Sequence, residues 1–412
     1  MEKFVIPCED CADARERMER DGFVVHGCTA HPTRPEMCEL SFSAAAELAT
    51  EALPATAAAG PSVATGVGAG ASVPVSAGAA LPASAHAASS ALPAAAAPPL
   101  TPTQARTAMA IVNLFETGQV LGDYGQVTLL EGDSGRLTYG RSQTTLGSGL
   151  LLKLLQQYVG NPGARFAHRL ALWLPAVAAA DAEIDTDNQL HNLLRACADD
   201  PVMRETQDLF FDTHYWRPAL RAAAREGLSS ALAVAVVYDS LVHGSYGRIR
   251  DRTVQTVGAA ALVGEKRWIS SYVQQRRRWL AEHSVPVLRQ TVYRMDAFQR
   301  LIELNQWGLT LPLVVRGAEI SMATLNGLPQ GCYDGPPPGS RPLMLAQPLA
   351  RGLDVRLIQL ALSDVGAAVK ADGVFGNASA RCIRQLQIVR GLPATGVADT
   401  ALIASLVAHP VA

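Results

Sequence analysis

The chain has 412 residues, which suits about two or three domains and rules out a single small module. Its 35 Lys and Arg nearly balance 37 Asp and Glu, and a net charge of −2 gives no overall basic field for holding nucleic acid. Hydrophobic residues make up 49%, but many are alanines in one stretch that adds little to a core. No uninterrupted apolar run reaches about eighteen residues, so no membrane span is expected.

Residues 1–43 predict a small folded unit with a strand at Phe4–Ile6, a charged helix at Ala12–Arg20 and a second strand at Phe23–His26. The start of this unit turns acidic at once, and it lacks the apolar region and the cleavage site of a secretory signal. We therefore expect a protein that is made in the bacterial cytoplasm without a Sec signal.

Four of the seven cysteines crowd into this unit, and the odd total argues against a fully paired disulfide framework. Cysteine and histidine at short spacing are the usual ligands of zinc, so a zinc site is one interpretation. The interpretation that we favour is reduced cysteines packed in a small domain. The candidate zinc ligands are Cys8, Cys11, Cys28 and His31.

Residues 44–100 consist almost entirely of Ala, Pro, Ser, Gly, Val and Thr, with repeated Leu-Pro and Ala-Pro steps and almost no charge. This composition predicts a flexible linker with an end-to-end distance of about 40 Å, which its proline content would extend. The units on either side are expected to move independently.

Residues 101–330 have a globular composition and mostly helical periodicity, interrupted by a strand-turn-strand pattern near residues 126–140. A Pro- and Gly-rich break at residues 331–342 separates this main domain from a third unit at residues 343–412. The expected fold class is mainly α, of the α+β type.

Two carboxylates of the main domain stand at positions suited to glycoside hydrolysis. Thr101 and Pro102 start an amphipathic helix that ends with Glu116, and Asp133 is expected at the tip of a tight turn between two short strands. One carboxyl group would protonate the leaving oxygen, and the other would act as nucleophile or activate water. Glu131 is a rival base. Taken alone, the pair is better explained as two solvated surface charges.

The surrounding segments FETG, GDSGRLTYG and TTLGSGLLLKLLQQYVG resemble the active-site opening of the inverting chitosanases, whose pattern has a Glu at a helix end and an Asp in GDGRGYT. The resemblance extends over residues 101–315, through YDSLVHG and the later segments YVQQRRRWLAE and FQRLIELNQWGL. It implies a two-lobed catalytic domain of the lysozyme and chitosanase type with a small β-hairpin region.

The resemblance implies a role for individual residues. Glu116 would be the general acid, Asp133 the general base and Thr138 the residue that helps to hold the attacking water. A buried charge network would support the acid, with its arginine register left open by the run RRR. The residues of this network would be Asp239, Arg276 and Arg300.

The resemblance also implies contacts with the substrate. One position departs from the pattern: after Gly-Ser-Gly the chitosanases have an Asp that can pair with a glucosamine amine, whereas this chain has Leu150. The slight overall acidity also gives little attraction for a polycation, so both observations predict a neutral, N-acetylated glycan. The implied contact residues are Tyr139, Gly149, Leu150, Tyr238 and His243.

Residues 343–412 contain GLDV at the start of a helix, ADGVFG at a turn and the later segment GLPATGVAD. These motifs resemble the small three-helix peptidoglycan-binding domain of many wall hydrolases. Regularly spaced apolar residues supply the helix faces of such a bundle. The resemblance implies a wall-binding module, which would raise the concentration of a linked enzyme at an insoluble substrate.

We therefore expect a bacterial cell-wall hydrolase of the muramidase type that cleaves β-1,4 bonds of peptidoglycan by inversion and without a cofactor. The alternatives are a chitosanase acting on chitosan, a phage endolysin and a non-catalytic wall-binding protein.

Without Sec export, the enzyme would reach the periplasm or wall of a target cell by lysis or injection. We favour an antibacterial type VI secretion effector with residues 1–43 as its docking piece. The expected partners are peptidoglycan glycan strands, a secretion-system component and a cognate immunity protein, but neither nucleic acid nor a membrane.

Overall fold

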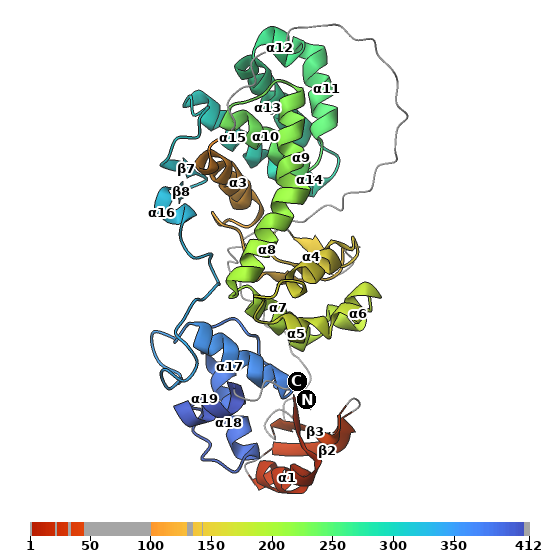
Figure 1. Cartoon of the computed structure of the whole chain (residues 1–412), viewed down its shortest axis with the longest axis vertical. Coiled ribbons are helices and arrows are strands. Elements are labelled where there is room, and N and C mark those ends of the chain that lie inside the picture. The colour runs from red at the N-terminus through yellow and green to blue at the C-terminus, as the bar shows by residue number, and fades with distance from the viewer. Residues whose placement is uncertain are drawn as a thin grey trace, which may run out of the picture.

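The computed structural model describes residues 2–20, 23–31, 34–44, 100–129, 135–141 and 143–407. Figure 1 shows an elongated molecule with three stacked bodies, which are a major lobe, a minor lobe and a C-terminal domain with the N-terminal unit beside it. Helices dominate this arrangement, which confirms the expected α+β class and the two-lobed architecture. None of the described helices combines the length and the apolar character that a membrane span requires.

The major lobe comprises residues 100–126 and 211–328, and its core surrounds helix α10 (Ala231–Val242), of which ten residues are buried. Such an apolar helix needs neighbours on every side, and the other helices of the lobe supply them. They are α3 (Pro102–Glu116), α9 (Arg217–Arg225), α11 (Tyr246–Val257), α12 (Ala260–Val263), α13 (Glu265–Ala281), α14 (Pro286–Arg289), α15 (Tyr293–Glu303) and α16 (Met322–Leu325), with the hairpin β7 (Leu313–Val315) and β8 (Ala318–Ile320).

The minor lobe, residues 127–210, packs helices against a small antiparallel sheet of order β4-β5-β6. The predicted hairpin is present, because Val127 pairs with Tyr139 and Thr128 pairs with Thr138. The elements are β4 (Val127–Thr128), β5 (Thr138–Tyr139), β6 (Thr144–Thr145), α4 (Leu150–Val159), α5 (Ala167–Ala171), α6 (Leu174–Ala178), α7 (Asn188–Cys197) and α8 (Pro201–Phe211).

A continuous helical segment joins the two lobes. Helix α8 of the minor lobe passes through a π-helical turn at Asp212–Trp216 into α9 of the major lobe. Gln207 on α8 also fixes the sheet, since its amide accepts from the N–H of Arg141 and donates to the carbonyl of Tyr124. Gly140 leaves the space for this contact, because a Cβ there would lie 2.4 Å from Oε1 of Gln207.

The C-terminal domain contains the three helices expected for it and is docked on the minor lobe. Leu360 belongs to the buried core of the minor lobe, and the fully buried Asn192 of α7 donates to the Val369 carbonyl at 2.7 Å and accepts from the Ala371 N–H at 2.8 Å. We call this contact between α7 and the C-terminal domain the seam. The helices are α17 (Leu353–Asp364), α18 (Asn377–Val389) and α19 (Thr400–Val407).

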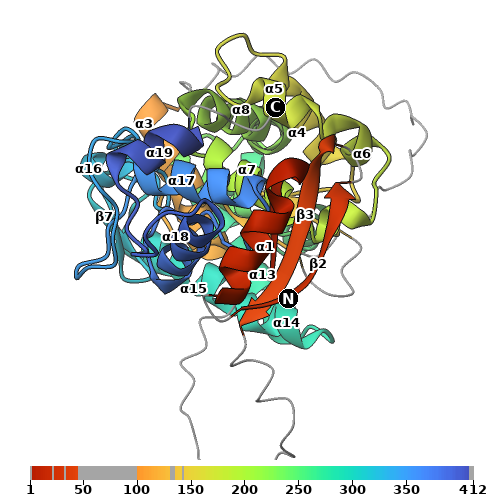
Figure 2. The same ribbon diagram turned by 90° about the horizontal axis from the view of Figure 1, so that it is seen from below.

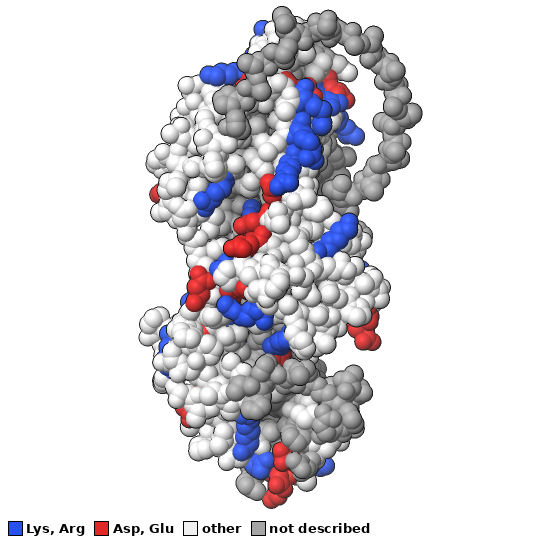
Figure 3. Space-filling view, viewed as in Figure 1, with Lys and Arg blue, Asp and Glu red and all other residues white. Residues whose placement is uncertain are grey.

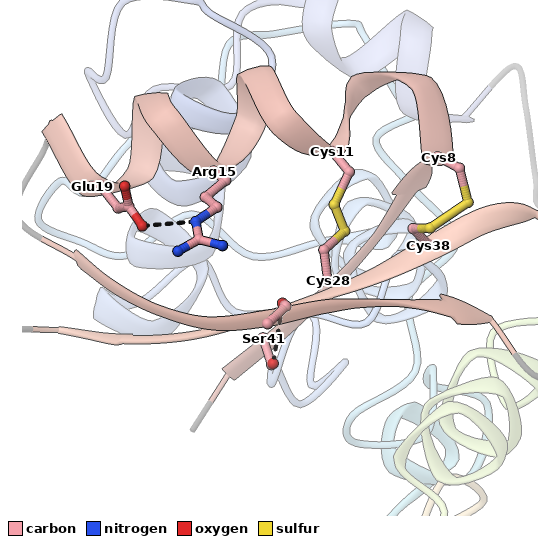
Figure 4. The surroundings of a disulfide bond; sticks show 8 residues. Cys8, Cys11, Arg15, Glu19, Cys28, Cys38 and Ser41 are labelled. Atoms are coloured by element: carbon pink, nitrogen blue, oxygen red, sulfur yellow. Dashed lines mark hydrogen bonds and ion pairs between the residues drawn. A yellow bond between two sulfur atoms is a disulfide. The ribbon is translucent and has the colours of Figure 1, made fainter.

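The N-terminal unit is a three-stranded antiparallel sheet of order β1-β3-β2 with one helix, so it has one strand more than the sequence predicted. Its four cysteines form the disulfides Cys8–Cys38 and Cys11–Cys28 (Figure 4). The zinc candidate and the reduced cysteines are therefore both wrong, since bonded sulfurs are not thiolate ligands. The elements are β1 (Glu2–Pro7), α1 (Cys11–Arg20), β2 (Phe23–His31) and β3 (Arg34–Ala44).

This unit is packed against the C-terminal domain, contrary to the expected independence. Ala14, Met18 and Leu40 share one buried core with α17, α18 and α19. Arg17 donates to the carbonyl of Val389 at 2.7 Å, at the end of α18. Figure 2 shows α1 beside α18. The sequence of the linker gave no sign of this contact, because its run of Ala, Pro, Ser and Gly is typical of a flexible tether; residues 45–99 lie outside the described residues.

Candidate active site

Glu116 lies at the end of α3, as predicted, with 28% of its side chain exposed. The helix ends there because Thr117 is its C-cap and Gly118 follows with φ of +72°. The hydroxyl of Tyr293 on α15 donates to the carbonyl of Phe115 at 2.9 Å, so the last turn is tied to a second helix. These contacts fix the direction in which the Glu116 carboxylate leaves the helix.

Arg294 joins Glu116 to a buried charge network. Its Nη1 lies 2.8 Å from Oε1 of Glu116 and 2.9 Å from Oδ1 of Asp239, so a single guanidinium nitrogen serves both carboxylates. Asp239 is fully buried, and Arg294 is 3% exposed. Burial alone would raise the pKa of Asp239, but Arg276 and Arg294 together hold this pKa below its ordinary value.

Arg276 completes the network from α13. It pairs with Asp239 through Nη1, lies 3.2 Å from Nδ1 of His243 through Nη2 and donates to Oγ of Ser245 at 3.2 Å through Nε. Burial, and then the charge of Arg294, lowers the pKa of His243 to about 3, so its imidazole stays neutral. The network therefore balances two arginines against Asp239 and Glu116.

One predicted member of this network is wrong. Arg300 has 68% of its side chain exposed and pairs only with Glu303, at 3.6 Å, within the described residues. Arg294 takes its place, because six residues turn an α-helix by about 240° and so carry Arg300 to another face. The sequence indicated this choice, because Phe298 and Leu301 follow Arg294 at positions i+4 and i+7, the spacing of residues on one buried face of a helix.

The minor lobe contributes Thr138, which lies in its small sheet and is 7% exposed. Thr138, Thr128 and Thr145 pair across β4, β5 and β6, so their side chains share one face of the sheet. Tyr139 alternates to the other face and enters the core of the minor lobe, which leaves Thr138 directed away from that core. Its hydroxyl donates to the carbonyl of Arg136 at 3.1 Å.

The predicted base lies between these strands. Strand β4 ends at Thr128 and β5 begins at Thr138, and the predicted tight turn between them lies outside the described residues. Both Asp133 and its rival Glu131 lie outside the described residues. Their roles stay predictions.

Two predicted substrate contacts are wrong because their side chains are fully buried. Tyr139 donates to the carbonyl of Leu194 at 2.8 Å inside the minor lobe, and Tyr238 packs between the rings of Phe211 and Trp216 in the major lobe. Aromatic rings in these sites support the core and cannot reach a glycan.

The other predicted contacts lie in different surroundings. Gly149 is the N-cap of α4 with φ of +72°, and Leu150 is the first residue of that helix and packs partly against the core of the minor lobe. His243 belongs to the charge network. No group of three His, Cys, Asp or Glu arranged to hold a metal occurs within the described ranges.

Charge is unequal between the two lobes. Residues 211–328 carry 15 Lys and Arg against 9 Asp and Glu, whereas residues 135–210 carry 7 against 8. On α9, three exposed arginines repeat every four residues, and Figure 3 shows Lys and Arg gathered over α9 and α11. The major lobe, which supplies Glu116, thus presents a positive field to any charged polymer.

Comparison with known proteins gives two matches to family models. Glycosyl hydrolase family 46 matches residues 110–313, and the peptidoglycan binding domain matches residues 351–406. A chitosanase of Bacillus subtilis (strain 168) is 29% identical over 237 residues, which are 53% of this chain and 84% of that protein.

Solved chitosanase structures also align with this chain. One is a mutant from Bacillus subtilis MY002 complexed with 6 GlcN, with 26% identity and a TM-score of 0.45 over 54% of this chain and all of that one. Another, from Gynuella sunshinyii with chitotetraose, has 23% identity and a TM-score of 0.43 over 54% of this chain and 99% of its own.

Proposed function

We propose that this chain, whose residues 110–313 match glycosyl hydrolase family 46 and whose residues 351–406 match a peptidoglycan binding domain, cleaves the glycan strand of peptidoglycan. The observation that supports this proposal most directly is the seam between α7 and the C-terminal domain. A peptidoglycan-binding domain that shares buried contacts with the catalytic domain holds the wall at a fixed distance from Glu116.

In the proposed reaction, Glu116 protonates the glycosidic oxygen as the bond to the anomeric carbon breaks. Asp133 removes a proton from a water that attacks this carbon from the opposite face, which inverts the configuration. Thr138, on the sheet face directed away from the core, helps to hold this water. Arg294 acts as a positioning residue, because its bond at 2.8 Å restricts the Glu116 carboxylate.

Charge supports a substrate other than a polycation. Leu150 stands where the chitosanase pattern has an amine-binding Asp, and the excess of basic residues in 211–328 repels a chain of protonated glucosamines. An N-acetylated glycan with acidic peptide branches carries no such positive charge, so the basic residues do not repel it.

Chitosan is the second candidate, and the comparisons favour it more directly than they favour peptidoglycan. The relative with 29% identity is named a chitosanase, and the structures that align with this chain are chitosanases too. An enzyme of this kind would use the same carboxylates on a different polymer.

The test incubates the full chain with peptidoglycan sacculi and, separately, with chitosan, and reads the products by mass spectrometry. Glu116→Gln and Asp133→Asn are each expected to lose about 10²- to 10⁴-fold in rate, whereas Glu319→Gln, an exposed residue on the same lobe, is expected to change nothing. Products ending in N-acetylmuramic acid would support the muramidase. Chitosan oligomers alone would favour the second candidate, and no products at all would favour a binding protein.

We also propose action in the periplasm or wall of a target cell, as for an injected effector. Disulfides persist in oxidising compartments, so the two disulfides of the N-terminal unit agree with a place of action outside the cytoplasm. Expression of the full chain with and without an added export leader tests this. Lysis only with the leader is expected, and equal lysis from both would contradict it.

A further inference from the structure

A groove of about 460 Å³ opens along the seam, and both domains line it. Residues 187–189, at the start of α7, form the wall from the catalytic domain. Residues 363 and 366–370, at the end of α17 and in the segment after it, form the wall from the C-terminal domain. Any ligand held here would contact the catalytic and the peptidoglycan-binding domain at once.

The seam around the groove is held by side-chain bonds. Asn188 donates to the carbonyl of Val369 at 3.2 Å, and Gln189 donates to the carbonyl of Ser363 at 3.1 Å. These bonds use the amide nitrogens and leave the amide oxygens of both residues as acceptors. Asn192, fully buried behind them, holds the same segment through Val369. The groove therefore has rigid walls.

The wall from the C-terminal domain carries a lysine and backbone N–H groups that are free to bind a ligand. Lys370 is exposed and forms no ion pair with any residue in the described ranges. Residues 367–370 have no regular secondary structure, and the N–H groups of Ala368 and Lys370 donate to no described acceptor. A cation beside free backbone donors suits a ligand that carries a carboxylate and amide carbonyls.

Helices α17 and α18 make the contacts of the C-terminal domain with its neighbours. Ten of the twelve residues of α17 are buried, and α18 packs against the N-terminal unit. Both domains line the groove, and none of the nine described residues that line it is aromatic, although aromatic faces are what sugar rings usually stack on. Its small residues, Gly366, Ala367 and Ala368, leave room for a peptide with short side chains.

We propose that this groove binds the peptide stem of peptidoglycan, a short peptide with small side chains and free carboxylates, with Lys370 pairing with a carboxylate. The backbone N–H groups of Ala368 and Lys370 donate to the peptide carbonyls, and the amide oxygens of Asn188 and Gln189 accept from the peptide N–H groups. This inference rests on the proposed function, because it assigns the recognition of the same substrate to a second site.

The test measures binding of a fluorescently labelled tetrapeptide stem to the full chain by anisotropy. Lys370→Glu is expected to weaken binding at least about tenfold, the loss of one charge-assisted hydrogen bond. Ala368→Trp, at an exposed position, fills the groove and should weaken binding to a similar degree. Lys153→Glu, an exposed lysine on α4 outside the groove, is the matched control and should leave the affinity unchanged.

The inference would be overturned if the wild type did not bind the peptide, or if Lys370→Glu and Lys153→Glu bound it with equal affinity. Retention of peptide-free glycan strands as strongly as intact sacculi would do the same, because it would assign recognition to the sugar. Hydrolysis of sacculi is measured separately. A chain that binds the peptide through Lys370 without cleaving sacculi contradicts the proposed function alone.

Discussion

Two buried arginine-aspartate pairs, one in the major lobe and one at the seam, are built in opposite ways. Asp239 accepts hydrogen bonds from two arginines, one of which also reaches Glu116. Asp199 at the seam has Nε of Arg356 3.1 Å from Oδ2, but in the described part of the chain neither of these atoms makes a hydrogen bond. Both oxygens of Asp239 thus accept hydrogen bonds from arginines, whereas Asp199 accepts through Oδ1 from the N–H of Tyr333 at 2.8 Å.

Their pKa values differ accordingly. Arg276 and Arg294 overcome the effect of burial on Asp239, whereas burial raises the pKa of Asp199 to about 6 despite Arg356. Arg356 instead gives its other nitrogens to backbone carbonyls, among them that of Ala371 at 2.8 Å. The network beside Glu116 thus keeps Asp239 charged through two arginines, whereas Arg356 at the seam donates mainly to backbone carbonyls.

The largest expected effect comes from removing the shared carboxylate. Asp239→Asn leaves the buried Arg276 without its counter-charge and Arg294 with Glu116 alone, and it should lower the free energy of unfolding by about 3–5 kcal/mol. Denaturant titration of the full chain measures this loss. Asp251→Asn, which removes an exposed ion pair, should cost less than about 1 kcal/mol. A loss of similar size in both variants would show that the buried network is no stronger than a surface pair.

The second prediction separates position from charge. Arg294→Lys keeps a positive charge, but a lysine ammonium on a flexible stem cannot reproduce the fixed contact with both carboxylates. Hydrolysis should fall about 10²-fold, since Glu116 loses its orientation. Arg300→Lys, on an exposed face of the same helix, is the matched control and should keep full activity. Equal rates for the two variants would remove the positioning role from Arg294.

The third prediction concerns the seam. Asn192→Leu leaves the N–H of Ala371 buried without its partner and the carbonyl of Val369 with Asn188 alone, which should cost about 2 kcal/mol. The C-terminal domain would then detach more often, and limited proteolysis between residues 329 and 350 should become faster. The control, Gln290→Leu at an exposed position of the major lobe, should be cleaved by the protease at the wild-type rate. Unchanged cleavage of the Asn192 variant would mean that apolar contacts alone hold the seam.

These comparisons show which features a sequence reveals. Glu116 could be placed because a helix end is a local property, set by its cap and by Gly118. The choice between Arg294 and Arg300 was also within reach, because it depends on helical period alone. The resemblance to the chitosanases implied Arg300, because matching motifs in order along the chain does not say which face of a helix a residue occupies.

The features that were missed depend on contacts distant in the chain. Asn192 and Ala371 are 179 residues apart, and no periodicity links them. The disulfides were missed because an odd cysteine total hides two complete pairs when the remaining cysteines, such as Cys197, lie buried elsewhere. Tyr139 and Tyr238 were misplaced because a motif near the active site includes core residues as well as contacts.

The smallest expected effect is the pH response of the seam. The pKa of Asp199 is about 6 in the folded chain and about 4 when unfolded, so the folded state binds the proton more tightly. This contribution to stability is complete below about pH 4 and is lost as the pH rises through 6. Between pH 7 and 5.5 the seam should gain about 1 kcal/mol, measured by unfolding or by slower proteolysis. Asp199→Asn cannot ionise and should flatten the pH response, whereas Asp251→Asn should keep it. An unchanged slope in the Asp199 variant would assign the response to another carboxylate.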